Sequence, residues 1–355
     1  VQWILLDSVP EPEMLAQAGR VVDYAHARGL FASAVTSFNE GQQNAHQLID
    51  PNDAVDDIAE LRASLDALLD VPWDSIVLNI GSSEFSETDD VVTVEWMDEA
   101  ARYLAETAPG VRIYATNHVP AGVWSETYGV SFYDLPRFAI PEMGTYVHTT
   151  MCYGLEGPAP VYGNTDFSRQ REFLLDQVDD RGIVYYPESA WWLTFDNMIP
   201  LFLPVYVRVR SEDIRFVGAV EGLEGHVTFT SGWEWAYWLT DLAIAYQSWR
   251  PELGMAEVLD AILGPIEPRA AEVVARMADS QHAALVQDRL MPFLTAEDLP
   301  TEIGYRAGIV FHALAPAPGE VMGYDGEALD DLAGQLDDLE AFCEESAGFQ
   351  AELEA

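Results

Sequence analysis

Two glutamates in this chain lie where catalytic carboxylates would be expected, each directly after a short apolar run. Glu84 follows residues 75 to 80, and Glu188 follows residues 183 to 187. In a parallel βα barrel, active-site groups come from the carboxyl ends of the strands. Glycoside hydrolysis needs two carboxyl groups, of which one protonates the leaving oxygen and the other attacks the sugar or activates water. The spacing therefore predicts Glu84 and Glu188 as a catalytic pair.

Other polar and aromatic residues follow the same apolar runs and fit a sugar-binding cleft. Flat aromatic rings stack on the apolar faces of sugars, while amide, imidazole, hydroxyl and carboxylate groups bind sugar hydroxyls. The predicted substrate-binding residues are Asn117, His118, Tyr153, Trp191, Asp196, Trp233, Glu234 and Trp235. Trp238, one helical turn further on, is predicted to lie in the core.

The elements that must position these residues alternate between short apolar runs and longer amphipathic stretches. Strands are predicted at 2–7, 30–37, 75–80, 111–116, 146–153, 183–187 and 227–230, and helices at 11–28, 53–69, 94–107, 167–180, 198–218 and 234–248. This alternation is typical of βα units with a parallel sheet. The fold class is therefore α/β, a (β/α)8 TIM-type barrel. Seven strands leave the barrel one short, and the chain opens directly on an apolar run, so we expect its first strand to be missing.

The last third of the chain is rich in Ala, Glu, Leu and Arg at helical spacing. We expect a barrel domain over residues 1–251 and a helical C-terminal extension over residues 252–355. Residues 327 to 354 are predicted to form an acidic amphipathic helix or a pair of helices on the outside.

The charge balance limits the partners of this protein. The chain has 60 Asp and Glu against 17 Lys and Arg, and all 17 are Arg. So negative a surface repels phosphate, which argues against nucleic acid and anionic membranes as partners. The carboxyl and aromatic residues above make a carbohydrate the expected partner. The acidic shell suits solubility or high salt, and it is compatible with an extracellular or periplasmic location or with the cytoplasm of a halophile. Oligomeric state is not indicated.

Motifs for other chemistries are missing from the sequence. It has neither H-x-H nor H-E-x-x-H, and Cys152 and Cys343 lie too far apart in sequence to indicate a disulfide framework or a Cys-based zinc site. Without lysine the chain cannot form a Schiff base. The two-glutamate mechanism requires no cofactor, so none is predicted.

The segment from Val21 to Leu30 resembles the second helix and third strand of cellulase-like members of the clan A retaining glycoside hydrolases. The likeness in element order spans residues 1 to 250. With the first strand missing, it implies that Glu84 follows the fourth strand as acid/base and that Glu188 follows the seventh as nucleophile. It also implies that Trp233 stacks on sugar, and that His118 and Tyr153 make polar contacts after the fifth and sixth strands.

Two departures from that family keep other functions open. Ser83 stands where the family has Asn, and Trp191 and Trp192 follow Glu188 closely where the family has small residues. One alternative is a non-catalytic carbohydrate-binding barrel. Another is a divalent-metal-dependent isomerase or lyase with Glu84, Glu188, Asp196 and His118 as ligands. A carboxyl separation of about 5 to 5.5 Å would indicate retention, and about 6.5 to 9.5 Å inversion.

Overall fold

The structure is a computed structural model. It describes residues 2–4, 12–39, 46–50, 52, 54–81, 88–189, 202–229, 234–287 and 321–355, with backbone only at 2–4 and 234–236. The chain divides into two compact units. Unit 1 comprises Val1–His148, Glu172–Tyr185 and Gly222–Gly225, and unit 2 comprises Thr149–Arg171, Tyr186–Glu221 and His226–Ala355. Each unit is described by itself below.

Within the described residues, seven strands form one sheet, and their order follows the sequence. The strands are β1 (Gln2–Ile4), β2 (Ser33–Ser37), β3 (Ser75–Asn79), β4 (Arg112–Asn117), β7 (Met143–Thr149), β8 (Ile183–Pro187) and β9 (Gly225–His226). The pairs from β1 to β7 are parallel, with Ser33 opposite Ser75 and Ile113 opposite Met143. This arrangement confirms the predicted α/β class with a parallel sheet.

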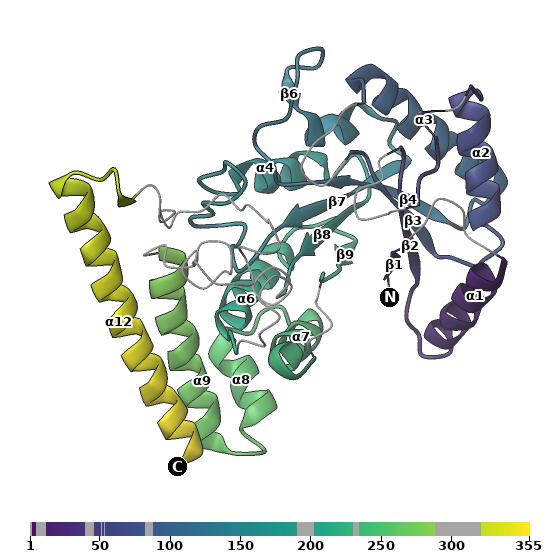
Figure 1. The fold of residues 1–355 in the computed structure, drawn as a ribbon. Coiled ribbons are helices and arrows are strands. Elements are labelled where there is room, and N and C mark those ends of the chain that lie inside the picture. Colours follow the sequence, from purple (N-terminus) through teal and green to yellow (C-terminus); the bar gives the residue numbers. More distant parts are fainter. Residues whose placement is uncertain are drawn as a thin grey trace. The chain divides into compact units, whose positions relative to one another are not determined.

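The helices of unit 1 pack on one side of β1 to β4 (Figure 1). They are α1 (Pro12–His26), α2 (Asp57–Leu68) and α3 (Asp90–Thr107). Helix α3 begins four residues earlier than predicted, because the Asp89 side chain caps it by accepting hydrogen bonds from the N–H groups of Val91 and Val92. Leu61, Leu65 and Met97 are among the fully buried residues of this core.

Short elements connect the strands of unit 1 to their neighbours. The hairpin β5 (Trp124–Ser125) with β6 (Val130–Ser131) and the 3-10 helix η2 (Phe132–Phe138) lie between β4 and β7. None of these elements was expected from the sequence. Strands of two residues carry too little alternation to be recognised. Helix α4 (Ser168–Gln177) precedes β8.

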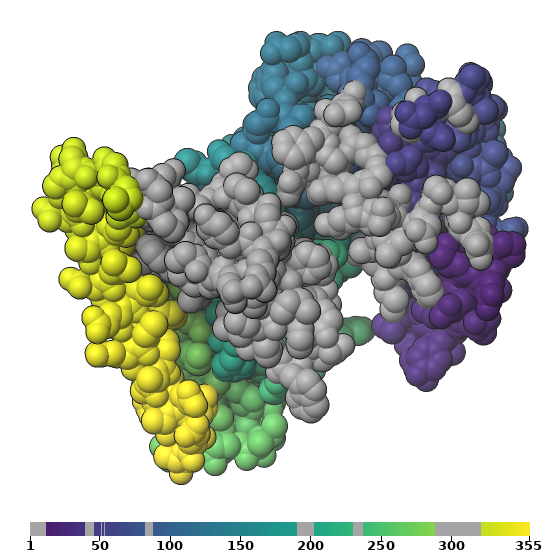
Figure 2. Space-filling model, in the orientation of Figure 1, coloured from purple at the N-terminus to yellow at the C-terminus, as the bar shows by residue number. Residues whose placement is uncertain are grey.

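Unit 2 is mainly helical. Its helices are α6 (Val205–Val217), α7 (Glu234–Ser248), α8 (Met255–Leu263), α9 (Pro268–Gln281), the π-helical turn η3 (His282–Gln287) and α12 (Gly326–Glu354). Contacts of Arg276 with Glu352 and of Ser280 with Glu345 show that α9 and α12 run antiparallel. Much of α12 is surface (Figure 2). In the described residues, no helix is long and apolar enough to span a membrane.

Three sequence predictions are wrong in detail. The strand predicted at 227–230 is observed as β9 at Gly225–His226, with an isolated bridge at Phe229. The fifth of the seven predicted strands, 146–153, is observed as β7 at Met143–Thr149, so Tyr153 lies in the loop after the strand. That loop leaves the sheet because Met151 adopts a left-handed conformation with φ of 56°. Trp238, predicted to be core, is 39% exposed on α7. The proposed boundary at residue 251 stays a prediction.

Candidate active site

Glu188 lies at the carboxyl end of β8 in unit 2 and is 2% exposed. It continues the parallel ladder beyond the strand, because its N–H donates to the carbonyl of Thr149 at 3.0 Å and it forms a β-bridge with Phe229. Its carboxylate Oε2 accepts a hydrogen bond from the Met151 N–H at 2.6 Å. Among the described glutamates it is the one in the buried class. The carboxyl end of a parallel strand is where this fold class concentrates its chemistry.

The loop after β7 contacts Glu188 through Met151. Its Met151 is 8% exposed and has φ of 56°, a conformation that residues other than glycine rarely adopt. Such local strain persists only where surrounding contacts hold it, and it is common at functional sites. Here the strained residue is the one whose N–H reaches Glu188.

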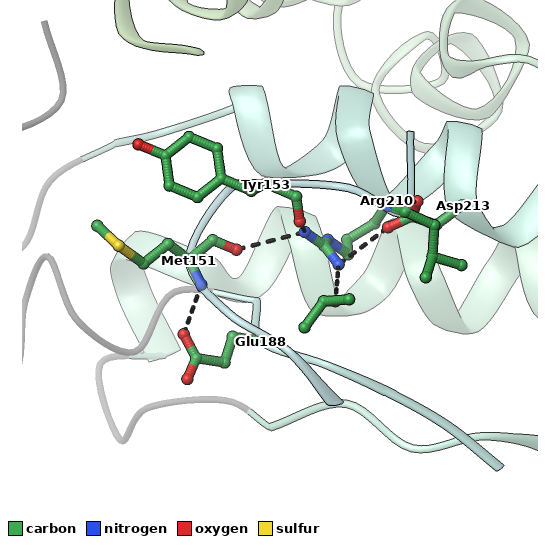
Figure 3. A network of polar contacts seen from close by, with 7 residues as sticks. Met151, Tyr153, Glu188, Arg210 and Asp213 are labelled. Atoms are coloured by element: carbon green, nitrogen blue, oxygen red, sulfur yellow. Dashed lines mark hydrogen bonds and ion pairs between the residues drawn. The ribbon is translucent and has the colours of Figure 1, made fainter. Parts of the chain in front are cut away.

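Arg210 of α6 is buried beside the same loop (Figure 3). Its guanidinium donates to Thr149 Oγ1 at 3.2 Å, to the Met151 carbonyl at 3.3 Å and to the Tyr153 carbonyl. It also forms an ion pair with Asp213 at 2.9 Å, and Asp213 accepts the Leu155 N–H at 2.9 Å. We call Thr149, Met151, Tyr153, Arg210 and Asp213 the Arg210 network. The two terminal nitrogens of the guanidinium are hydrogen-bonded and paired inside the protein, as burial of a charge requires.

Two further buried groups lie near Glu188. Burial, followed by the negative charge of Cys152 and Glu188 when ionised, raises the pKa of Tyr206 well above its usual value. Burial also raises the pKa of the Cys152 thiol to about 12, although the positive charge of Arg210 opposes this. Both groups therefore keep their protons at neutral pH. On the other side, the Ser189 hydroxyl donates to Asp241 of α7 at 3.0 Å.

The predicted residues Asn117 and His118 belong to unit 1, at the end of β4. Asn117 is fully buried, and its amide donates to the Tyr133 carbonyl at 2.8 Å and to Asp134 at 2.7 Å. His118 accepts the Val119 N–H on Nδ1 at 2.7 Å and packs edge-on to His148, with ring centroids 4.9 Å apart. Asn117 thus uses its donors within the protein, which is the pattern of a structural residue.

The structure describes only part of the predicted site. Tyr153 is in the loop after β7, 2% exposed, with its carbonyl bound by Arg210. Glu84, Trp191, Asp196 and Trp233 lie outside the described residues, and so do the side chains of Glu234 and Trp235, whose backbone begins α7. The carboxyl separation of Glu84 and Glu188 and the roles of these residues stay predictions.

Sequence reasoning missed Arg210 and Asp213. A signal was available, because Val207, Arg210, Ile214 and Val217 recur at helical spacing and place the arginine on an apolar face. Asp213 follows it at the i+3 position, where an opposite charge can pair with it. A buried arginine with a local carboxylate is therefore readable from this stretch.

The described part of the chain contains hollows but no cluster of metal-binding side chains. No group of three or more His, Cys, Asp or Glu side chains that could hold a metal occurs there. A hollow of about 340 Å³ in unit 1 is lined by Arg112, Tyr114, Gly144 and Glu224, at the amino ends of the strands. In unit 2, a hollow of about 500 Å³ lies between α9 and α12.

Comparison with known proteins gives only weak likenesses. No protein-family model and no curated protein matches the sequence. An O-GlcNAc hydrolase structure from Thermobaculum terrenum is 10% identical, with a TM-score of 0.47 over 74% of this chain and 54% of that chain, so this chain spans about half its length. A chitinase from Chromobacterium violaceum is 14% identical, with a TM-score of 0.42 over 70% and 90% of the two chains. The Rubisco of Pyrococcus horikoshii is 12% identical, with a TM-score of 0.37 over 73% and 62%. At these TM-scores the likeness assigns no activity.

Proposed function

We propose that this protein is a glycoside hydrolase of the retaining type, with Glu188 as its nucleophile. The observation that carries the proposal is a buried carboxylate at the carboxyl end of a parallel strand, held by a backbone N–H at 2.6 Å from a strained loop residue. Such an N–H stabilises the ionised carboxylate and fixes its direction, and a nucleophile needs both. The resemblance to clan A enzymes supports the same role for Glu188.

The reaction would proceed in two displacements. A Glu188 oxygen bonds to the anomeric carbon while the glycosidic bond breaks, and Glu84 passes its proton to the leaving oxygen. Water then attacks the anomeric carbon of the glycosyl-enzyme, gives a proton to Glu84, and releases the Glu188 carboxylate. The aromatic residues Trp191, Trp233 and Trp235 would stack on the sugar, with Asp196 and Glu234 near its hydroxyls.

The test is hydrolysis of a panel of 2,4-dinitrophenyl α- and β-glycosides by the wild type, Glu188→Gln and Glu156→Gln. Glu188→Gln keeps the shape of the side chain but removes the nucleophilic charge, so we expect kcat to fall about 10,000-fold or more. Glu156 is an exposed carboxylate in the segment after β7, paired with Arg171. Its variant is the matched control and should retain full activity.

Covalent trapping makes the test direct. A 2-deoxy-2-fluoro derivative of the hydrolysed glycoside should leave its sugar on the peptide that contains Glu188, as detected by mass spectrometry. Hydrolysis by Glu188→Gln at the wild-type rate would contradict the assignment of the nucleophile. A wild type that binds the sugars without hydrolysing any member of the panel would favour the carbohydrate-binding alternative.

A further inference from the structure

Helix α6 carries an unusual buried face. Tyr206, Arg210 and Asp213 follow one another at positions i, i+4 and i+7, and they are 0%, 1% and 3% exposed. A helix that packs on a sheet normally buries apolar side chains on that face. Burying an arginine and an aspartate is costly unless each is paired and hydrogen-bonded. Burying this face therefore costs free energy that apolar side chains of similar size would not cost.

Thr149, the last residue of β7, and Met151, in the loop after it, connect Arg210 to Glu188, and each contacts both. Thr149 accepts the Glu188 N–H on its carbonyl at 3.0 Å and accepts Arg210 on its hydroxyl at 3.2 Å. Met151 donates its N–H to the Glu188 carboxylate at 2.6 Å and accepts Arg210 on its carbonyl at 3.3 Å. The first connection fixes the backbone of Glu188 and the second fixes its carboxylate.

Arg210 also holds the strained part of the loop. Its bonds to the carbonyls of Met151 and Tyr153 span Cys152 and keep Met151 at φ of 56° (Figure 3). Asp213 fixes the guanidinium through the ion pair and fixes the next stretch of loop through the Leu155 N–H. The absence of a side chain at Gly154 leaves room for this contact, because a Cβ there would lie 2.9 Å from Val209 and 3.0 Å from Asp213 Oδ1.

We propose that Arg210, oriented by Asp213, is a positioning residue that aims Glu188 at the anomeric carbon by holding the Met151 N–H on its carboxylate. The inference rests on the proposed role of Glu188. It adds that the geometry of the nucleophile is set from α6, through a loop that has no regular secondary structure of its own.

The test uses the full chain with four substitutions. Arg210→Lys keeps the positive charge but cannot make the same set of bonds with a planar guanidinium. Asp213→Asn keeps the acceptor for the Leu155 N–H and removes the charge that orients Arg210. It is the variant to measure if Arg210→Lys does not fold. Arg208→Lys is the matched control on the same helix, since Arg208 pairs with Asp279 and Glu212 instead. Arg181→Lys controls for loss of a buried arginine outside the Arg210 network.

The first measurement is independent of enzyme activity and uses Cys152 as a reporter of the loop. In a Cys343→Ser background, Cys152 is the one remaining thiol. It is buried with its pKa raised to about 12, and only the thiolate reacts, so N-ethylmaleimide should label it slowly in the wild type. We expect Arg210→Lys to speed labelling about tenfold or more, because the loop opens more often. Both control variants should label like the wild type.

The second measurement separates positioning from folding. On the best 2,4-dinitrophenyl glycoside, Arg210→Lys should lower kcat about 10- to 100-fold with KM changed less than about threefold, because a displacement near 1 Å costs this much at a reacting centre. Asp213→Asn should show the same split with a smaller loss. Arg208→Lys and Arg181→Lys should leave kcat of the folded protein unchanged.

Each outcome decides the inference. Faster Cys152 labelling together with a selective loss of kcat in Arg210→Lys supports it. Labelling equal to that of Arg208→Lys, or an unchanged kcat, overturns it. If Glu188→Gln stays active, the proposed function fails by itself, and the positioning role for a nucleophile falls with it, whatever the labelling shows about the loop.

Discussion

Two buried arginines bind the segments that precede and follow β7 in the sequence, and they differ in their partners. Arg181, in unit 1, donates to the carbonyls of Pro136, Arg137, Ala139 and Met143, the segment that leads into the strand. Arg210, in unit 2, donates to carbonyls in the loop that leaves it. In the described part of the chain, Arg181 has no carboxylate partner, and burial lowers its pKa, whereas Arg210 is paired with Asp213.

This difference shows that hydrogen bonds from a buried arginine to backbone carbonyls can serve either stability or the positioning of a functional residue. Arg181 donates to backbone carbonyls at the amino end of a strand, where parallel βα folds place residues for stability. Arg210 binds at the carboxyl end, and the residues it contacts also contact Glu188. Asp213 adds a charged partner that fixes the direction of the Arg210 guanidinium, whereas backbone carbonyls and the Gln177 amide oxygen, at 3.1 Å from Nε, do so for Arg181.

The largest expected effect is on stability when either arginine is replaced by methionine. Arg210→Met leaves Asp213 buried without its partner, and Arg181→Met leaves carbonyls without donors, so each should lower the free energy of unfolding by about 3 to 5 kcal/mol. Adding Asp213→Leu to Arg210→Met should recover much of that loss, because a buried ion pair is often replaceable by apolar residues. Urea unfolding at constant salt measures both. If the double variant recovered no stability, the unpaired Asp213 would not be the cause of the loss in Arg210→Met, and this difference between the two arginines would be contradicted.

Two glycines sharpen the comparison with a smaller effect. A Cβ at Gly144 of β7 would lie 2.5 Å from the Tyr114 ring and 2.9 Å from the Gly182 carbonyl, whereas at Gly154 it would lie 2.9 Å from Val209 and 3.0 Å from Asp213. Gly144→Ala should cost about 1 to 3 kcal/mol of stability. Gly154→Ala should cost less in urea unfolding, but it should speed Cys152 labelling. The reverse pattern would argue against a special role for the loop.

The smallest effect is expected at an exposed arginine. Arg112 forms an ion pair with Glu224 at 2.9 Å, but their side chains are 64% and 28% exposed. Arg112→Gln should therefore change the free energy of unfolding by less than about 1 kcal/mol, and the change should shrink in molar salt because exposed charges are screened. Arg210→Met should lose as much stability in high salt as in low salt. A salt-dependent loss for Arg210 would contradict its burial.

The sequence by itself determined the order and type of the main elements. Apolar runs and amphipathic stretches predicted β3, β4 and β8, and helices α1, α2 and α7 within a few residues, because these signals are local and repeat at the period of each structure. It also placed Glu188 directly after the strand that is observed as β8. Net charge, the absence of lysine and the helical C-terminal stretch were likewise readable from composition and spacing.

Only the tertiary structure decided where β7 ends and what holds Glu188. The run through Met151 and Cys152 is apolar enough to continue a strand. However, Arg210 donates to the carbonyls of Met151 and Tyr153, and Glu188 accepts the Met151 N–H. These hydrogen bonds replace those of the sheet. Arg210 is separated from that loop by more than fifty residues, so no local pattern links them. Periodicity reports which face of an element is buried, whereas partners far apart in sequence meet only when the chain has folded.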